Sequence, residues 1–96
     1  MTTELKYLRA KLRIGVFVAM HADRMGDKEG MKLGEGILNL TTKELADQQV
    51  REGKSPLNGL RIIDEEFDKA GELTLLEARD LGLWLSANRP CDRSHK

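Results

Sequence analysis

The sequence predicts an all-α fold, a small bundle of four to five helices in a single domain. Apolar residues recur at intervals of three or four along most of the chain, which is the spacing of a buried helix face. Residues that favour helix starts and stops bound several of these stretches. The length of 96 residues suits one small domain, so we expect residues 1–90 to form it and residues 91–96 to be a mobile tail.

The first predicted helix spans residues 3–25, where Leu5, Leu8 and Leu12 begin an apolar stripe. The end of this stretch, IGVFVAM, also contains alternating β-branched residues, which are typical of a strand. A strand over residues 12–20, and with it an α+β fold, is therefore the alternative. The length of the apolar pattern favours the helix.

Four glycines interrupt the next stretch, MGDKEGMKLGEG, and predict a loop or a short fifth element there. We expect the second helix to begin at Thr41, because Thr41 and Glu44 have the T-x-x-E spacing of a capping box. In such a box the threonine hydroxyl and the glutamate carboxylate each accept a backbone hydrogen bond at the helix start. This helix should end near Gly53.

Two further helix starts follow. Ser55 and Pro56 predict the third helix, with serine as the cap and proline in the first turn. A second T-x-x-E box, Thr74 to Glu77, predicts the fourth, after a stop at Gly71. Because an L-R-I tripeptide precedes each box, one interpretation is a duplication into two helix–loop–helix units, the first with the longer loop.

Residues 66–77 also resemble the twelve-residue calcium loop of EF-hand proteins, with an aspartate, a glycine and a final glutamate in frame. The likeness fails at two ligand positions, because the first lacks the usual aspartate and the fifth is Ala70. Asp68, Glu72 and Glu77 are thus only weak metal candidates, and helix capping accounts for the motif without an ion. We predict no metal and no cofactor, and a degenerate calcium-responsive module is a minor alternative.

The composition excludes several classes of function. Sixteen basic and sixteen acidic residues cancel, which argues against tight non-specific binding to nucleic acid. One cysteine cannot form an internal disulfide, so we expect a cytoplasmic protein. The longest apolar run is too short to span a bilayer. No catalytic motif is present, and we predict that the protein is not an enzyme.

Two surfaces are candidates for binding. Lys6, Arg9 and Arg13 follow helical spacing and form a candidate patch for an anionic partner or nucleic acid. The last predicted helix is apolar on most sides, which indicates an interface. Its candidate partner-binding residues are Leu76, Leu81, Trp84 and Leu85.

Together these features predict a small regulatory or adaptor protein that binds a macromolecular partner, in particular a protein. We expect it to self-associate as a homo-oligomer through the last helix, without a membrane. A small size combined with a binding function is typical of accessory proteins of bacteria or their phages. The alternative is a nucleic-acid-associated regulator that uses the basic first helix.

Overall fold

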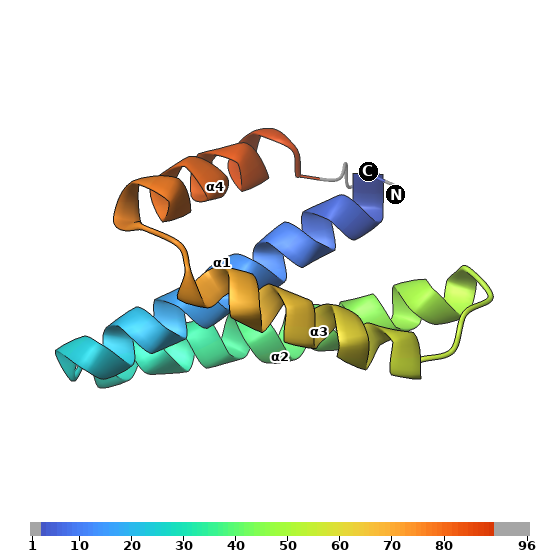
Figure 1. The fold of residues 1–96 in the computed structure, drawn as a ribbon, viewed down its shortest axis with the longest axis horizontal. Helices are drawn as coiled ribbons and strands as arrows, with labels where there is room; N and C mark the ends of the chain where they lie inside the picture. Colours follow the sequence, from blue (N-terminus) through green and yellow to red (C-terminus); the bar gives the residue numbers. More distant parts are fainter. Residues whose placement is uncertain (1–2, 90–96) are drawn as a thin grey trace, which may run out of the picture.

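The computed structural model describes residues 3–89, which form four helices and no strand (Figure 1). The all-α prediction is therefore confirmed, and residues 12–20 are helical. The predicted tail, 91–96, lies outside the described residues. The helices are, in order, α1 (Thr3–Met25), α2 (Lys28–Arg51), α3 (Leu57–Gly71) and α4 (Leu75–Ala87).

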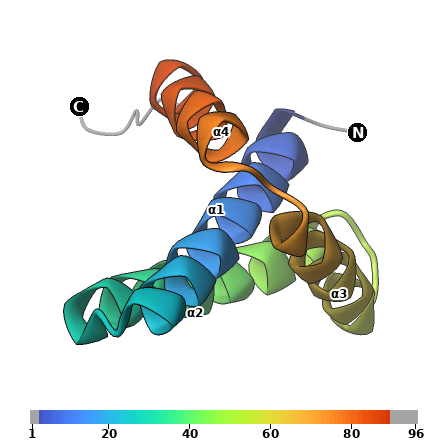
Figure 2. The ribbon, with the colours of Figure 1, turned by 60° about the vertical axis from the view of Figure 1, so that its left-hand side comes forward.

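Three of the helices surround one core. α1 and α2 form a long antiparallel hairpin, and α3 packs against both of them (Figure 1). α4 lies across α1 on the other side and packs against that helix alone (Figure 2). The buried core cluster joins the first three helices, with its members being Leu8, Leu12, Leu45 and Ile62.

The glycine-rich stretch is helical from Lys28 onward, which corrects the prediction of a loop before Thr41. α2 begins at Lys28, where the carboxylate of Asp27 caps the helix by accepting a hydrogen bond from the Gly30 amide at 3.0 Å. Thr41 therefore lies inside α2, buried, and its hydroxyl has no hydrogen-bond partner among the described residues. The predicted box at Thr41 and Glu44 is wrong, and the long first loop of a duplicated unit is reduced to residues 26–27.

Close packing of α1 and α2 explains the glycines at two helical positions, Gly34 and Gly15. A Cβ atom at Gly34 would lie 2.6 Å from the backbone nitrogen of Ala19. A Cβ atom at Gly15, on the facing helix, would lie 2.8 Å from Cγ2 of Ile37. Glycine inside a helix costs about 1 kcal/mol relative to alanine. Here the absent side chains let the two helices approach, and the packing offsets that cost.

The starts of α3 and α4 follow the predicted signals. The hydroxyl of Ser55 accepts a hydrogen bond from the Leu57 amide at 3.1 Å, and Pro56 already has helical φ and ψ. The box at Thr74 and Glu77 is complete, with backbone amides donating to the threonine hydroxyl at 3.1 Å and to the glutamate carboxylate at 3.0 Å. The predicted box at Thr74 and Glu77 is confirmed, whereas α3 begins one residue later than predicted, with Pro56 in place of Ser55 at the cap position.

The local structure of residues 66–77 differs from that of a calcium loop. Residues 66–71 belong to α3, so the connection to α4 consists of residues 72–74 alone. A calcium loop of the EF-hand type needs about twelve residues that wrap around the ion. The chain between these helices is too short for that loop.

Candidate functional site

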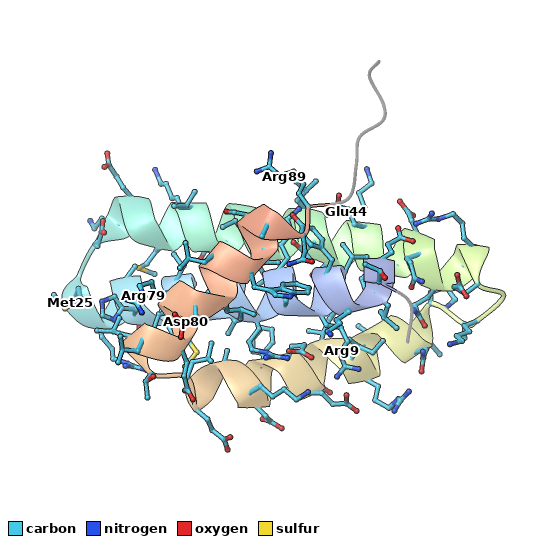
Figure 3. All side chains as sticks on the ribbon, turned by 90° about the horizontal axis from the view of Figure 1, so that it is seen from above. Arg9, Met25, Glu44, Arg79, Asp80 and Arg89 are labelled. Atoms are coloured by element: carbon cyan, nitrogen blue, oxygen red, sulfur yellow. The ribbon has the colours of Figure 1, made fainter. Side chains whose placement is uncertain are left out.

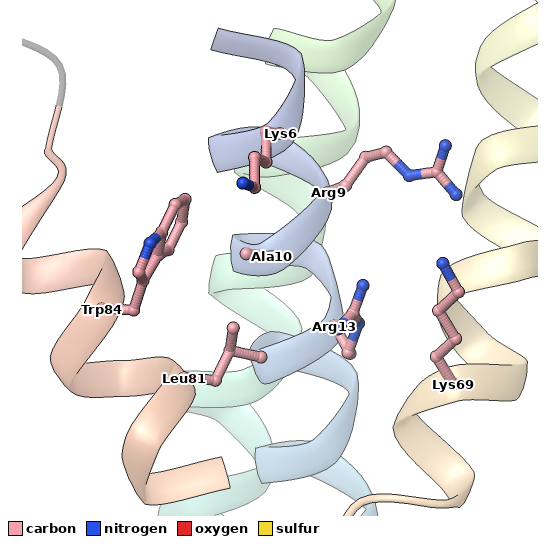
Figure 4. Close-up of a pocket in the computed structure, with 7 residues that line it drawn as sticks. All are labelled: Lys6, Arg9, Ala10, Arg13, Lys69, Leu81 and Trp84. Atoms are coloured by element: carbon pink, nitrogen blue, oxygen red, sulfur yellow. The ribbon is translucent and has the colours of Figure 1, made fainter. Parts of the chain in front are cut away.

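An open groove of about 610 Å³ lies between α1, α3 and α4 (Figure 4). It is the candidate functional site and is called the groove below. α1 supplies most of its lining, while α3 and α4 each supply part of a wall. The lining residues are Lys6, Arg9, Ala10, Arg13, Lys69, Leu81 and Trp84.

The two walls of the groove differ in character. Trp84 and Leu81, from α4, lie on one side of α1 in Figure 4, whereas Arg13 and Lys69 lie on the other. Between them is Ala10, a small buried side chain that leaves the space open. The groove is therefore amphipathic, with an apolar wall facing a cationic wall.

A fully buried carboxylate, Glu66 of α3, holds the arginines in place. Its side chain is 0% exposed. One carboxylate oxygen accepts from Nε of Arg9 at 2.7 Å, and the other accepts from Nε of Arg13 at 2.6 Å. Arg9 also donates to the carboxylate of Glu65 at 2.6 Å. Charge-assisted hydrogen bonds of this length fix both guanidinium groups and join α1 to α3.

Burial and ion pairing shift the pKa values of Glu66 and Arg9 in opposite directions. Burial by itself would raise the pKa of Glu66, but the hydrogen bonds from Arg13 and Arg9 outweigh it and hold that pKa below its usual value. Burial likewise disfavours the charged form of Arg9, yet the bonds to Glu66 and Glu65 leave its pKa raised. Glu66 and Arg9 are therefore both charged at neutral pH.

The groove still has an excess of positive charge. Four cations line it, whereas two carboxylates, Glu65 and Glu66, lie beside them. Within the described residues no carboxylate pairs with Lys6. Lys69 is half-exposed, and its Nζ is 3.7 Å from the Glu66 carboxylate that both arginines already share. Lys6 and Lys69 are consequently the cations most available to a ligand.

The tryptophan of the apolar wall is held by α1. The ring centroids of Trp84 and Tyr7 are 6.5 Å apart, with planes inclined at 35°. Nζ of Lys6 lies 5.8 Å from the centroid of the Trp84 ring, in the range of a cation–π contact. These two contacts position the indole over α1 and at the edge of the groove.

The structure brings together residues whose sequence pattern predicts two separate surfaces. Lys6, Arg9 and Arg13 share the groove with two of the candidate interface residues, Leu81 and Trp84. The other two lie elsewhere, because Leu85 is half-buried and does not line the groove, and Leu76 faces solvent.

The sequence did not predict three residues of the groove and its ion pairs, namely Ala10, Lys69 and Glu66. One signal for Glu66 was available. On α3 it lies four residues from Ile62 and four from Ala70, and all three are buried. A carboxylate at a core position of a helix requires a cationic partner, and the first helix offered several. Ala10 and Lys69 carry no comparable signal.

The weak metal candidates do not converge. Asp68, Glu72 and Glu77 are all exposed, and residues 3–89 contain no group of three or more His, Cys, Asp or Glu side chains that could hold a metal ion.

The described helices also include none with the length and apolar content needed to cross a membrane.

The groove can donate hydrogen bonds to anionic groups along one wall and bury apolar groups against the other. Its lining contains no carboxylate, histidine or thiol. Comparisons of the chain with protein-family models, curated proteins and solved structures gave no match.

Proposed function

We propose that this chain is a small non-enzymatic regulatory or adaptor protein, and that its groove binds an acidic segment of a partner protein. The observation that carries the proposal is the excess of positive charge facing an apolar wall in a chain with no net charge. Local concentration of charge in a neutral protein favours a specific anionic partner over a non-specific one.

The residues have complementary tasks in this proposal. Lys6 and Lys69 receive carboxylates of the bound segment, while Trp84 and Leu81 cover one of its apolar side chains. Arg9 is already held by Glu66 and Glu65, so little side-chain entropy is lost when it contacts the ligand. A partner segment with both acidic and apolar residues matches both walls.

Fluorescence of Trp84, the only tryptophan in the chain, tests the proposal. The probes are a short peptide that alternates glutamate with leucine and a second peptide with lysine in place of glutamate. We expect the acidic peptide to shift the emission in a saturable manner, and its affinity to fall as salt is added. Equal binding of both peptides, or of neither, would contradict the proposal.

Two groove variants separate shape from charge. Ala10→Phe fills the space between the walls and leaves every cation in place, whereas Lys6→Glu reverses one charge and leaves the space open. Each should weaken binding of the acidic peptide by tenfold or more, on the order of 1.4 kcal/mol. Lys32→Glu is the matched control, because Lys32 is an exposed lysine of α2 outside the groove. Wild-type affinity in both groove variants would exclude the groove as the binding site.

A second candidate function is binding of single-stranded nucleic acid. The observation in its favour is the position of Lys6 beside the Trp84 ring, since bases stack on aromatic rings flanked by cations. Glu65 and Glu66 beside the arginines oppose it, because they repel phosphates. We expect an oligothymidylate probe to bind more weakly than the acidic peptide at physiological salt. The reverse order, with a steep log–log salt dependence, would favour the nucleic-acid function.

A further inference from the structure

α4 has an apolar face that none of the described helices covers. Ala78, on the side that packs against α1, is 7% exposed, whereas Leu76 and Leu83 are 64% and 63% exposed. Successive helical residues are separated by about 100°, so Leu76 and Leu83, seven positions apart, lie on one line along the outer side of the helix. Leu75 is also 65% exposed, but it lies about 90° from this line. We call Leu76 and Leu83 the outer face.

Two opposite charges flank the line of leucines. From the helix geometry, Arg79 lies about 50° to one side of it and Asp80 about 50° to the other. Figure 3, the view from above, shows α4 lying over α1 with both residues on it. Their side chains are 65% and 66% exposed and contact each other at 3.2 Å. An ion pair this exposed contributes little to stability and is readily exchanged for another.

We propose that the outer face pairs with the same face of a second copy, in a dimer whose two α4 helices run parallel about a two-fold axis. In this arrangement Leu76 meets Leu76 of the other copy, and Leu83 meets Leu83. Arg79 of each chain then lies beside Asp80 of the other. Both charged residues exchange an internal contact for an intermolecular one.

The charges select the orientation of the two helices. A two-fold axis parallel to the helices brings opposite flanks together, so each arginine faces an aspartate. An antiparallel pair brings equal flanks together, so arginine would face arginine and aspartate would face aspartate. Flanking charges set orientation in paired helices for this reason. The self-complementary pattern is what identifies a second copy as the occupant of this face.

The dimer is independent of the groove and its ligand. Leu81 and Trp84 line the groove from α4, but neither belongs to the outer face, so both grooves remain open in the dimer. An α4 of 13 residues offers less than the roughly 800 Å² per partner of a standard interface. We therefore expect a dissociation constant in the micromolar range, and a dimer that presents two grooves to its partners.

Sedimentation of the full chain tests the pairing. We expect the wild-type protein to shift from monomer to dimer as its concentration rises through the micromolar range. Leu76→Glu combined with Leu83→Glu should abolish the shift. Leu33→Glu is the matched control, because Leu33 on α2 is 63% exposed, as Leu83 is. A wild-type monomer at high micromolar concentration, or loss of the dimer in the Leu33 variant instead, would overturn the proposal.

Charge reversal and cross-linking test the orientation. Arg79→Glu or Asp80→Lys alone should weaken the dimer, and the two together should restore it, because the pairs re-form with their signs exchanged. In a chain carrying Cys91→Ser, a single cysteine at Leu76→Cys should form a disulfide-linked dimer under mild oxidation, as should one at Leu83→Cys. An antiparallel pair would instead cross-link only a mixture of the two variants, which would contradict the parallel arrangement.

Discussion

Glu66 determines how α1 and α3 meet. It is a carboxylate without solvent exposure, and each of its oxygens accepts a hydrogen bond from a different arginine of α1. A buried charge is tolerated only when it is paired, and removing one partner leaves the remaining charges uncompensated. The basic residues that the sequence offered as a free patch are therefore partly structural. Arg9 and Arg13 hold the protein together and line the groove as well.

Replacing Glu66 by alanine should lower the free energy of unfolding by about 2–4 kcal/mol. The estimate lies below the usual effect of breaking a buried ion pair, because the two guanidinium groups keep some contact with water. Glu65→Ala is the matched control, since Glu65 is 42% exposed and its loss should cost under about 1 kcal/mol. Urea denaturation of both variants measures the difference, and equal losses would show that Glu66 has no special role.

The same carboxylate predicts an acid-sensitive contribution to stability. Because the pKa of Glu66 is lowered in the folded protein, its charged form stabilises the fold fully above the unfolded value, about pH 4.3. That stabilisation is lost as the pH falls through the lower, folded pKa. Glu66→Gln does not titrate, so the stability gap between wild type and this variant should be constant near neutrality and shrink below about pH 4.3. A gap that stays constant down to pH 3 would contradict this assignment.

At the scale of the elements, α2 departs most from its sequence pattern. Glycines at positions 30, 34 and 36 predicted a break, yet the helix runs through all three. Only part of this glycine content serves the packing. Gly34 lies against the backbone of Ala19, whereas a Cβ atom at Gly36 would have nothing within 4 Å.

Alanine at these two glycines should have opposite effects on stability. Gly34→Ala forces a methyl group against the backbone of α1 and should destabilise the protein by about 1–3 kcal/mol. Gly36→Ala adds a better helix former on an exposed turn and should stabilise it by about 0.5–1 kcal/mol. Thermal unfolding of the two variants measures both effects. Stabilisation by both substitutions would show that α1 and α2 do not approach closely at Gly34.

Local sequence signals predicted three of the four helices. Contacts between residues far apart in the sequence could not be predicted. Thr74 with Glu77, and Ser55 with Pro56, act within one turn, so their order along the chain suffices to predict a helix start. Asp27 was an equally local cap, but the glycines that follow it concealed the helix it starts. The burial of one of them, Gly34, depends on its contact with α1, which no local pattern encodes.

For the candidate site as well, the residues were predictable from local sequence but their contacts were not. The cations of the first helix and Trp84 were predictable as candidate binding residues, because their types and spacing are visible in the sequence, and all of them line the groove. Their meeting in one groove was not, because it depends on how α4 crosses α1. Nor was the pairing of Arg9 with Glu66, which are 57 positions apart. Contacts at such separation follow from the fold and leave little trace in local sequence.

At the scale of the whole molecule, stability is unevenly distributed. The core cluster joins α1, α2 and α3, while α4 packs on α1 alone and contributes no member to that cluster (Figure 2). An element with few buried contacts opens more readily than the core does. The groove and the outer face both use α4, so both proposed binding surfaces depend on the helix with the fewest contacts to the core.

Hydrogen exchange should report this difference directly. We expect amide hydrogens in α4 to exchange roughly tenfold or more faster than those in the centre of α1, because local opening of α4 leaves the three-helix core intact. Thr74→Ala should accelerate exchange in α4 further, since the lost cap costs about 1 kcal/mol, and leave α1 unchanged. Ser86→Ala, a change at an exposed position of the same helix, is the control. Equal protection of α1 and α4 would contradict this division.

Because Glu66 lies far from its arginines in the sequence, the nascent chain contains the arginines before their counter-ion. A ribosome synthesises Arg9 and Arg13 more than fifty residues before it reaches Glu66. The whole of α1 and α2 precedes it as well. Any hairpin of those two helices that forms on the nascent chain therefore carries two guanidinium groups without their buried counter-ion. Translation of α3 supplies the charge that completes the α1–α3 contact.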